Sequence, residues 1–412
     1  MKQFRENNAF LQLPENARAR SLLKSMGYDT EDLKRPRIGV ANSWGETSPG
    51  HIHLRAVADA AKAGIWQAGG TPFEFNSPAQ CPMSVGEHGM RYDLPTRDII
   101  AAEVETMAEI GLLDGLVLIS SCDKNVPAHI LAAARLDILV IFVTGGPMSS
   151  GGSCLKTVTI SNLDAECYMY GVGDPRVSPG ELLEIEDASC PGAGSCAILG
   201  TANTMQCMTE ALGLALPGGG TAPAVSAKRI WLAKESGRRI VALVREEVTS
   251  RKIITKAALR NAIKILHAIG GSTNAVAHLL ALSYELHWEK EINLDLIEKF
   301  SDEMPCITSV TPAGTHSMGD FDDAGGVQAV MKAVEERLET DVLTVSGRTL
   351  KEQLAGVKFT PSDVIHDVAN PTAKNGLVIL RGNLACSAVV RTPVIPKGML
   401  KHSGPANRKR GA

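Results

Sequence analysis

The apolar positions in the first third of this 412-residue chain follow two alternating patterns. Short runs that are apolar almost throughout are typical of strands buried on both faces, and longer runs with a period of about 3.6 residues are typical of helices. The predicted strands are 37–43, 73–77, 114–122 and 138–146, and the predicted helices between them include 54–70 and 97–113. This alternation predicts an α/β fold with a parallel sheet covered by helices.

From about residue 194 to 285 the pattern becomes helical, and we expect these helices to cover the same domain. Segment 367–376, with its Pro, Gly and Asn, is the best linker candidate. Residues 377–390 have the pattern of strands that open a second domain, yet the 22 residues that follow them are too few to bury a core. We therefore predict one α/β domain over 1–370, which would carry the reactive groups, and a linker and domain stub over 371–412.

The balance of charged residues and the lengths of the apolar runs argue against nucleic acids and membranes as partners. The chain has 42 Lys and Arg against 45 Asp and Glu, so no broad cationic surface is available to neutralise a nucleic acid. No segment offers the roughly 18 consecutive apolar residues of a membrane span, and the N-terminus has no apolar run of the secretion type. We expect a soluble, cytoplasmic protein that binds neither nucleic acid nor membrane.

The nine cysteines are an odd number, scattered through a chain without a secretion signal, which favours free thiols or metal ligands over disulfides. Cys122, Asp123 and Lys124 follow a predicted strand directly, and ligands of parallel sheets bind beyond the carboxyl ends of the strands. The triplet offers a thiolate, a hard oxygen ligand and a charge for an anionic substrate. Alternatively, the cysteine is a small core residue beside a solvated ion pair.

The segment CPGAGSC (190–196) places two cysteines around glycines, where the backbone could wrap closely around an inorganic cluster. It also matches a loose dinucleotide-binding fingerprint, but the preceding residues do not have a strand pattern and no acid follows about 20 residues later. Segment GGPMSSGG (145–152) either presents backbone N–H groups to an anion or is only a flexible turn. The glycines of 216–223 are explained by a turn between helices.

Four histidines have structural explanations beside functional ones. His51 and His53 have a spacing that could bind a metal, but they precede an apolar helical run and are better explained as residues at a helix entry. His267 and His278 lie on helical segments, where we expect core histidines with satisfied polar atoms.

Taken in order, several motifs resemble the family of dihydroxy-acid and sugar-acid dehydratases over about residues 35 to 405. They include SPGHIHL, GEHGMRYDLPTRD, SCDKNVPA, CPGAGSCAILGTANTM, HAIGGSTNAVAHLLA and PAGTHSMGDFDDAGGV. The resemblance implies an iron–sulfur hydro-lyase that removes water from a 2,3-dihydroxy carboxylate to give a 2-oxo acid. It also implies a homodimer, because family members complete the site between domains and subunits.

By the same resemblance, Cys122 and Cys196 are ligands of the iron–sulfur cluster, which is of the 2Fe-2S or 4Fe-4S type. Asp123 and Lys124 are ligands of a neighbouring Mg²⁺, with the lysine carbamylated so that it offers oxygen. The cation would stabilise the enolate that forms when the proton next to the carboxylate leaves, and an iron would act as a Lewis acid on the departing 3-hydroxyl.

Two positions depart from the family pattern. Gly50 lies where many members carry a third cluster cysteine. Cys81 lies where a further acidic Mg²⁺ ligand is expected, and a thiol is a poor ligand for magnesium. Two hypotheses follow: Cys81 is the third ligand of the cluster, or Glu87 replaces the missing acid.

Family members continue into a β-rich domain that supplies another glutamate ligand and a serine base, and residues 384–387 (LACS) depart from the expected Pro-Asp. We therefore interpret 371–412 as the stub of a truncated C-terminal domain, and no catalytic base can be named. The first hypothesis is a dihydroxy-acid dehydratase of valine and isoleucine synthesis. The alternatives are a dehydratase of gluconate, arabinonate or xylonate, and a truncated family member without catalysis.

Overall fold

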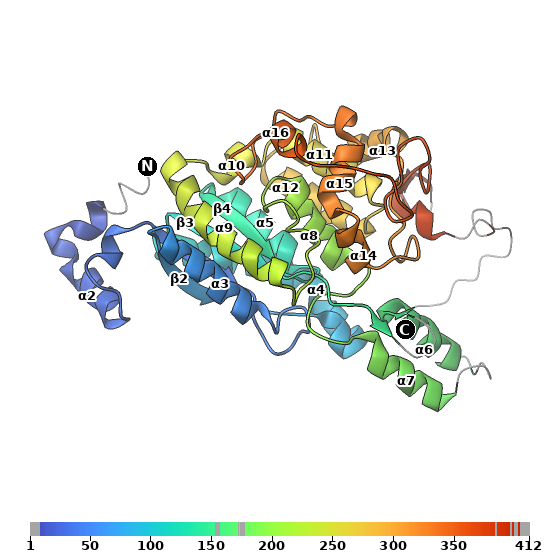
Figure 1. Cartoon of the computed structure of the whole chain (residues 1–412), viewed down its shortest axis with the longest axis horizontal. Helices are drawn as coiled ribbons and strands as arrows, with labels where there is room; N and C mark the ends of the chain where they lie inside the picture. The colour runs from blue at the N-terminus through green and yellow to red at the C-terminus, as the bar shows by residue number, and fades with distance from the viewer. Residues whose placement is uncertain are drawn as a thin grey trace.

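Four parallel strands form the sheet at the centre of the structure (Figure 1). A computed structural model describes residues 9–152, 157–171, 173, 178–383, 385–395, 398 and 403. The strands are β1 (Arg37–Asn42), β2 (Thr71–Asn76), β3 (Gly115–Ser120) and β4 (Leu139–Thr144), in the order β2-β1-β3-β4. All four predicted strands and the parallel sheet are confirmed.

Three of these strands are apolar runs because the sheet is covered on both faces. Every residue of β1, β3 and β4 is buried, whereas the edge strand β2 is buried only at its first two residues and then alternates between half-buried and exposed positions. In register, Val117 of β3 lies between Val40 of β1 and Ile141 of β4. These side chains form the middle of the core.

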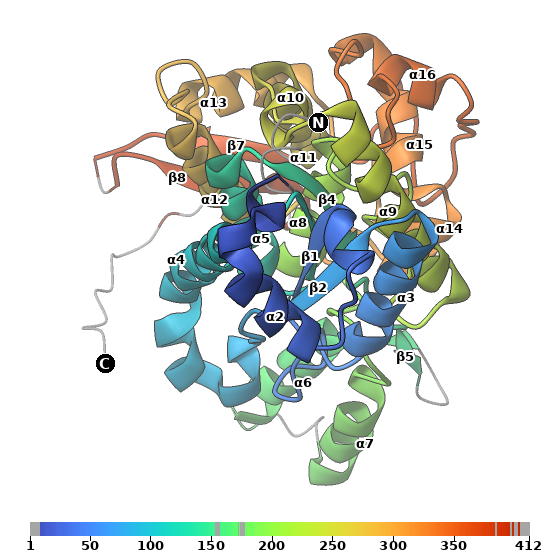
Figure 2. The same cartoon turned by 90° about the vertical axis from the view of Figure 1, so that its left-hand side faces the viewer.

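Helices cover both faces of the sheet (Figures 1 and 2). Helices α3 (Leu54–Gln67) and α9 (Ala227–Glu246) cover one face, and α4 (Gly86–Ile110) and α5 (Asn125–Leu136) cover the other. Glycine allows α3 and α9 to pack closely, since a Cβ at Gly64 would lie 2.0 Å from the carbonyl oxygen of Lys234. Helix α4 begins well before the predicted start at residue 97, because it accommodates Pro95 in its interior.

The predicted helical region after residue 194 is confirmed. Helix α8 (Thr201–Ala211) is buried along its whole length and packs against α5 and α11. The other α-helices in the described part of the chain are α2 (Ala17–Ser25), α6 (Ile160–Gly171), α7 (Pro179–Ser189), α10 (Ser250–Ile253), α11 (Lys256–Ala268), α12 (Thr273–Glu285), α13 (Leu294–Glu303), α14 (Met318–Asp323), α15 (Gly326–Ala333) and α16 (Leu350–Leu354). No described helix is both long and apolar enough to cross a membrane.

Two short antiparallel hairpins complete the described structure. Strands β5 (Gly151–Gly152) and β6 (Thr157–Val158) form one, and β7 (Leu377–Leu380) and β8 (Ala388–Arg391) form the other, where strands were predicted. The second hairpin is joined to α13 and to the loop before α8, because the Ser301 hydroxyl donates to the Leu377 carbonyl at 2.6 Å and Arg391 Nη1 donates to the Leu199 carbonyl at 3.0 Å. The last six residues, NRKRGA (407–412), whose sequence is that of a solvated basic tail, lie outside the described residues.

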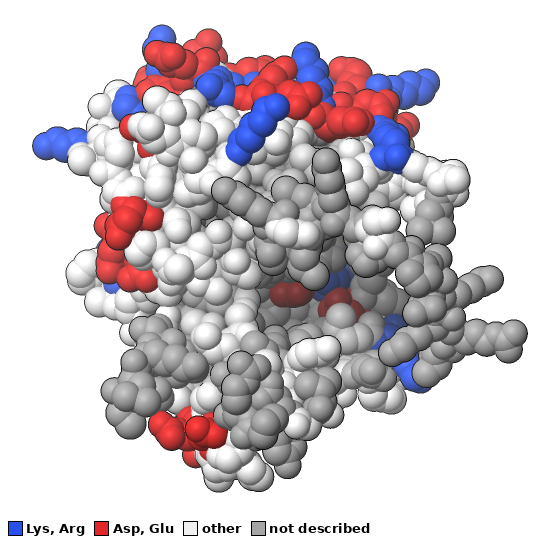
Figure 3. Space-filling model, turned by 90° about the vertical axis from the view of Figure 1, so that its right-hand side faces the viewer, with Lys and Arg blue, Asp and Glu red and all other residues white. Residues whose placement is uncertain are grey.

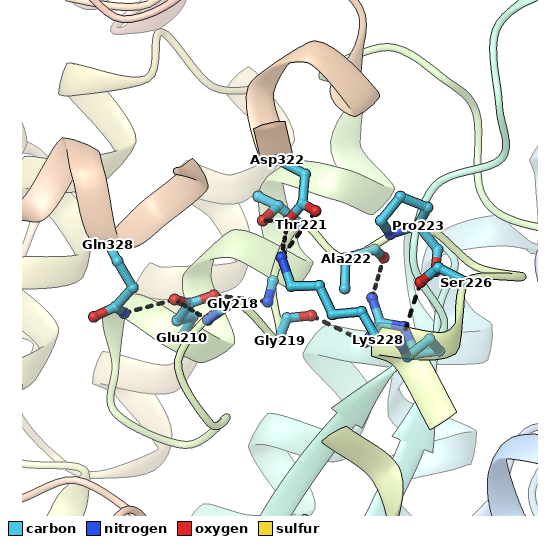
Figure 4. A network of polar contacts seen from close by, with 12 residues as sticks. Glu210, Gly218, Gly219, Thr221, Ala222, Pro223, Ser226, Lys228, Asp322 and Gln328 are labelled. Atoms are coloured by element: carbon cyan, nitrogen blue, oxygen red, sulfur yellow. Dashed lines mark hydrogen bonds and ion pairs between the residues drawn. The ribbon is translucent and has the colours of Figure 1, made fainter. Parts of the chain in front are cut away.

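A buried carboxylate fixes the glycine-rich turn at 216–223 (Figure 4). Glu210, on the last turn of α8, accepts hydrogen bonds from the Gly218 and Gly220 N–H groups at 2.8 and 2.7 Å and from Gln328 at 2.6 Å. Burial raises the pKa of Glu210, and these donors partly offset that effect. The turn predicted for this segment is confirmed, and its N–H groups hold the carboxylate.

A buried cation fixes the other side of the same turn. Arg229, on the first turn of α9, is fully buried. Its Nη1 donates to Thr144 Oγ1 at 3.1 Å and to the Gly219 carbonyl at 3.0 Å, and its Nη2 donates to the Ala222 carbonyl. Burial lowers the pKa of Arg229 to about 10. The guanidinium therefore joins the end of β4 to the turn.

We predict that Arg229→Met lowers the free energy of unfolding by about 3 kcal/mol, because it leaves buried acceptors without a donor. Arg238→Met, on the exposed side of the same helix, should cost less than about 1 kcal/mol. Urea denaturation followed by circular dichroism measures both. Equal losses for the two variants would contradict the role assigned to Arg229.

Candidate active site

A pocket of about 140 Å³ lies near the carboxyl ends of the strands and is the candidate active site. The strand order places β1 between β2 and β3, so the loops that follow β1 and β3 leave the sheet side by side. The pocket is lined by Cys81, Cys122 and Cys196, by Asp93 and Asp123, and by the start of α8. Four of the five predicted site residues therefore line one pocket, although 115 positions separate the first cysteine from the last (196 − 81).

Cys122 follows β3 and is held by the loop that follows β1. Its side chain is buried, and its backbone N–H donates to Nε2 of the buried His51 at 3.1 Å. Gly50 leaves room for the thiol, because a Cβ there would lie 2.5 Å from the Cys122 sulfur. Position 50 therefore cannot carry a larger side chain unless that sulfur moves.

Cys81 approaches the same sulfur from the loop between β2 and α4. The two thiols interact, and the interaction with Cys122 lowers the pKa of Cys81 to about 7. The same interaction, together with burial, raises the pKa of Cys122. The hypothesis that placed Cys81 beside the cluster site is consistent with this geometry. The Glu87 side chain of the rival hypothesis lies outside the described residues.

Cys196 reaches the pocket on a loop that α8 holds in place. The Asn203 amide donates to the carbonyl groups of Cys196 and Ile198 at 2.5 and 2.7 Å. Gly194 has φ +134°, and a Cβ there would lie 2.3 Å from the Met148 nitrogen, so only glycine permits this close approach. Burial raises the pKa of the Cys196 thiol to about 12, with Asp123 as the next cause.

The segment that begins at Gly145 supports the cysteine loop. The N–H of Met148 donates to the Ser195 carbonyl at 2.7 Å, and the N–H of Gly146 donates to the Gln206 side chain at 2.7 Å. Because these N–H groups already have acceptors, the structure favours a supporting turn over the anion site considered from the sequence.

The charged residues of the site include one that was not predicted. Lys124 Nζ lies 2.7 Å from Asp93 Oδ2, and both side chains are buried. Asp123 lines the pocket beside them. Burial raises the pKa of Asp123, while the positive charge of Lys124 acts in the opposite direction. Asp93 lies on α4, twelve residues beyond Cys81, and only the packing of this helix against α5 reveals its contact with Lys124.

The sulfur donors suit an iron–sulfur cluster, and the oxygen donors suit a harder cation. Three thiols from three separate segments line a pocket that also contains two carboxylates. In the described part of the chain, no group of three or more His, Cys, Asp or Glu side chains is already spaced to hold a metal ion. Cys154 lies outside the described residues, and the cysteines of the described part of the chain form no disulfide with one another.

The remaining candidates have structural roles. His53 lies at the N-terminal end of α3, as expected, with Nε2 2.8 Å from the Gly145 carbonyl oxygen. His267 and His278 are buried on helices, but neither ring nitrogen of His267 and not Nε2 of His278 has a hydrogen-bond partner among the described residues, so the expectation of satisfied polar atoms is wrong for both. The dinucleotide alternative fails, because helix α7 precedes the glycines at 192 and 194.

Figure 3 shows the face at the right of Figure 1, where acidic and basic side chains lie in a hollow. Charged side chains also gather along the upper edge of this face, while most of the described surface between them is uncharged. Such a surface suits a small anionic ligand better than a polyanion.

Comparisons with known proteins agree with this arrangement. Residues 35–353 match the family model described as dihydroxy-acid/6-phosphogluconate dehydratase N-terminal. A dihydroxy-acid dehydratase of Methanothrix thermoacetophila is 47% identical over 403 residues, which cover 95% of this chain and 71% of that protein. Dihydroxy-acid dehydratase 1 of Methanosarcina acetivorans is 45% identical over 95% of this chain and 72% of its own length.

A dihydroxy-acid dehydratase of Caldicellulosiruptor bescii is 44% identical over 95% of this chain and 71% of its own length. Both the family model and these relatives include the segments that carry the three pocket cysteines. The chain thus belongs to the dihydroxy-acid/6-phosphogluconate dehydratase family.

Proposed function

We propose that this chain is the cluster-binding part of an iron–sulfur hydro-lyase that converts a 2,3-dihydroxy carboxylic acid into a 2-oxo acid. The observation that supports this most directly is the convergence of Cys81, Cys122 and Cys196 on one pocket that also contains carboxylates. Three protein thiolates leave one iron of a 4Fe-4S cluster, or one position of a 2Fe-2S cluster, without a protein ligand. When bound, such a cluster supplies a Lewis acid for the leaving hydroxyl group.

Mg²⁺ is proposed as the second cofactor, held by Asp123 and by Lys124 in its carbamylated form. Asp123 is well placed, because it lines the pocket together with the first residues of α8. Lys124 contacts Asp93, so this ion pair must open before Lys124 can offer oxygen to a metal. When bound, Mg²⁺ supplies positive charge for a developing enolate. Asp93 provides a second carboxylate at the same wall.

The residues of the chain prepare the pocket for this chemistry by excluding water. Cys122 and Lys124 are buried, and α8 and the Gly145 segment cover the Cys196 loop. In such a site each charge acts more strongly on the substrate than it would in water. The relatives are named dihydroxy-acid dehydratases, which favours a branched-chain dihydroxy acid over a sugar acid as the substrate.

A homodimer in the cytoplasm is the proposed state of the protein. Large apolar side chains are exposed along α4, including Tyr92 at 63%, Ile99 at 62% and Ile110 at 74%. Exposed large apolar side chains are typical of interfaces between protein chains.

The first test is the iron and acid-labile sulfide content after anaerobic purification. We expect at least two of each per chain in the wild type, by the stoichiometry of the smallest cluster. Cys122→Ser and Cys196→Ser should lose most of both, and Cys81→Ala should lose them if it is the third ligand. Cys386→Ser, at an exposed cysteine, is the matched control and should keep the wild-type content. Full iron in Cys81→Ala would remove Cys81 from the ligand set.

The second test is turnover of dihydroxyisovalerate against gluconate, arabinonate and xylonate. We expect the specificity constant kcat/KM to be at least about tenfold higher for dihydroxyisovalerate, because discrimination between a methyl-bearing and a hydroxyl-bearing carbon chain is of this size or larger. Detection of the 2-oxo acid product measures the rate. Faster turnover of a sugar acid would reverse the assignment, and no turnover by a chain with an intact cluster would favour a non-catalytic family member.

The third test measures the divalent cation site with Mn²⁺ as an electron paramagnetic resonance probe in the cluster-loaded protein. We expect Asp123→Asn to weaken Mn²⁺ binding by about tenfold or more, because a hard ligand is lost. Asp98→Asn changes a largely exposed carboxylate on α4 and should leave the affinity unchanged. The same affinity in both variants would place the cation elsewhere.

A further inference from the structure

We propose that Ser48 is a positioning residue that donates a hydrogen bond to the sulfur of Cys122 and so makes the bound iron a stronger electron acceptor. The inference rests on the proposed cluster, since it concerns the way in which one of its ligands is tuned. Ser48 Oγ lies 3.5 Å from Cys122 Sγ, and both side chains are buried. Ser48 was not predicted as a site residue from the sequence.

The direction of the hydrogen bond follows from the chemistry of the ligand. In the free thiol either atom could donate. A cysteine that binds iron is a thiolate without a proton, so only the Ser48 hydroxyl can then be the donor. Because Ser48 is 2% exposed, water has little access to replace this donor.

The backbone around Ser48 fixes the hydroxyl in this place. The Ser48 carbonyl accepts hydrogen bonds from the N–H groups of His51 and Ile52 at 3.1 and 3.2 Å, which forms a tight turn before α3. The same turn contacts the rest of the site, because His51 accepts from the Cys122 N–H and the Pro49 carbonyl accepts from the Gly194 N–H at 2.8 Å. One short segment thus contacts both loops that carry the cysteines Cys122 and Cys196.

A donor at a ligand sulfur has an electronic effect beyond its structural one. A hydrogen bond withdraws electron density from a thiolate, so the iron to which it is bound is easier to reduce and is a stronger Lewis acid. In a hydro-lyase the Lewis acidity of iron acts on the leaving hydroxyl, so Ser48 would contribute to the reaction without contacting the substrate.

The experiment compares Ser48→Ala, Ser48→Thr and Ser43→Ala in the cluster-loaded protein. Iron and sulfide per chain are measured first, and then the midpoint potential by a redox titration monitored by electron paramagnetic resonance. We expect Ser48→Ala to keep its cluster and to lower the midpoint potential of the cluster by about 59 mV. For a one-electron couple, this shift means that the ratio of reduced to oxidised cluster at a fixed applied potential falls about tenfold. Ser48→Thr keeps a hydroxyl group, so its cluster should have a midpoint potential close to that of the wild type.

Ser43→Ala is the matched control. Ser43 is also fully buried after β1, but its hydroxyl contacts Ser77 and His129 and not the cysteine. A cluster-loaded Ser48→Ala with an unmoved potential would overturn the inference and leave the proposed function intact. An equal shift in Ser43→Ala would also overturn it, because the effect would then be that of any lost buried hydroxyl. A wild-type chain without iron would overturn the cluster itself and, with it, the role of Ser48.

Discussion

The order of the strands is the constraint on which the site depends. Because β1 lies between β2 and β3, the loops after β1 and β3 leave the same edge of the sheet next to each other. The first loop carries Ser48 and His51, and the second carries Cys122. The hydrogen bond from the Cys122 N–H to His51 joins them, so the position of this cysteine follows from the sheet and not from a flexible loop.

The third loop of the site is held from the opposite side by α8. Successive turns of this buried helix present Asn203, Gln206 and Glu210, which bind the Cys196 loop, the Gly145 segment and the glycine-rich turn, respectively. A buried polar network of this kind is stable only when its members are satisfied together, which makes the segments around the pocket interdependent. Rigid support of this kind is what a metal cofactor requires, since small displacements of its ligands weaken binding.

Burial of the cysteines also has an energetic consequence. Burial contributes to raising the pKa values of Cys122 and Cys196, so a thiolate is unfavourable in either position without a compensating positive charge. Iron supplies that charge, and the binding of metal to such thiols is coupled to the loss of their protons. The carboxylates of Asp93 and Asp123 add negative charge to the same pocket, and Lys124 is the buried cation beside them. The pocket is therefore electrostatically prepared for cations.

The secondary-structure elements and most of the candidate ligands were predictable from the residue pattern alone. The apolar runs of β1, β3 and β4 predicted a sheet covered on both faces, since strands of this kind are buried on both sides. In the structure each of these strands is buried throughout. The cysteine that follows β3 and the glycines around Cys196 indicated a cofactor site for local reasons of chemistry and backbone geometry. Which distant side chains meet depends on the three-dimensional packing. Asp93 reaches Lys124 through the packing of α4 on α5, and Ser48 reaches Cys122 through the order of the strands. Neither contact has a local signature, because each joins segments that are neighbours only after the sheet and its helices have formed.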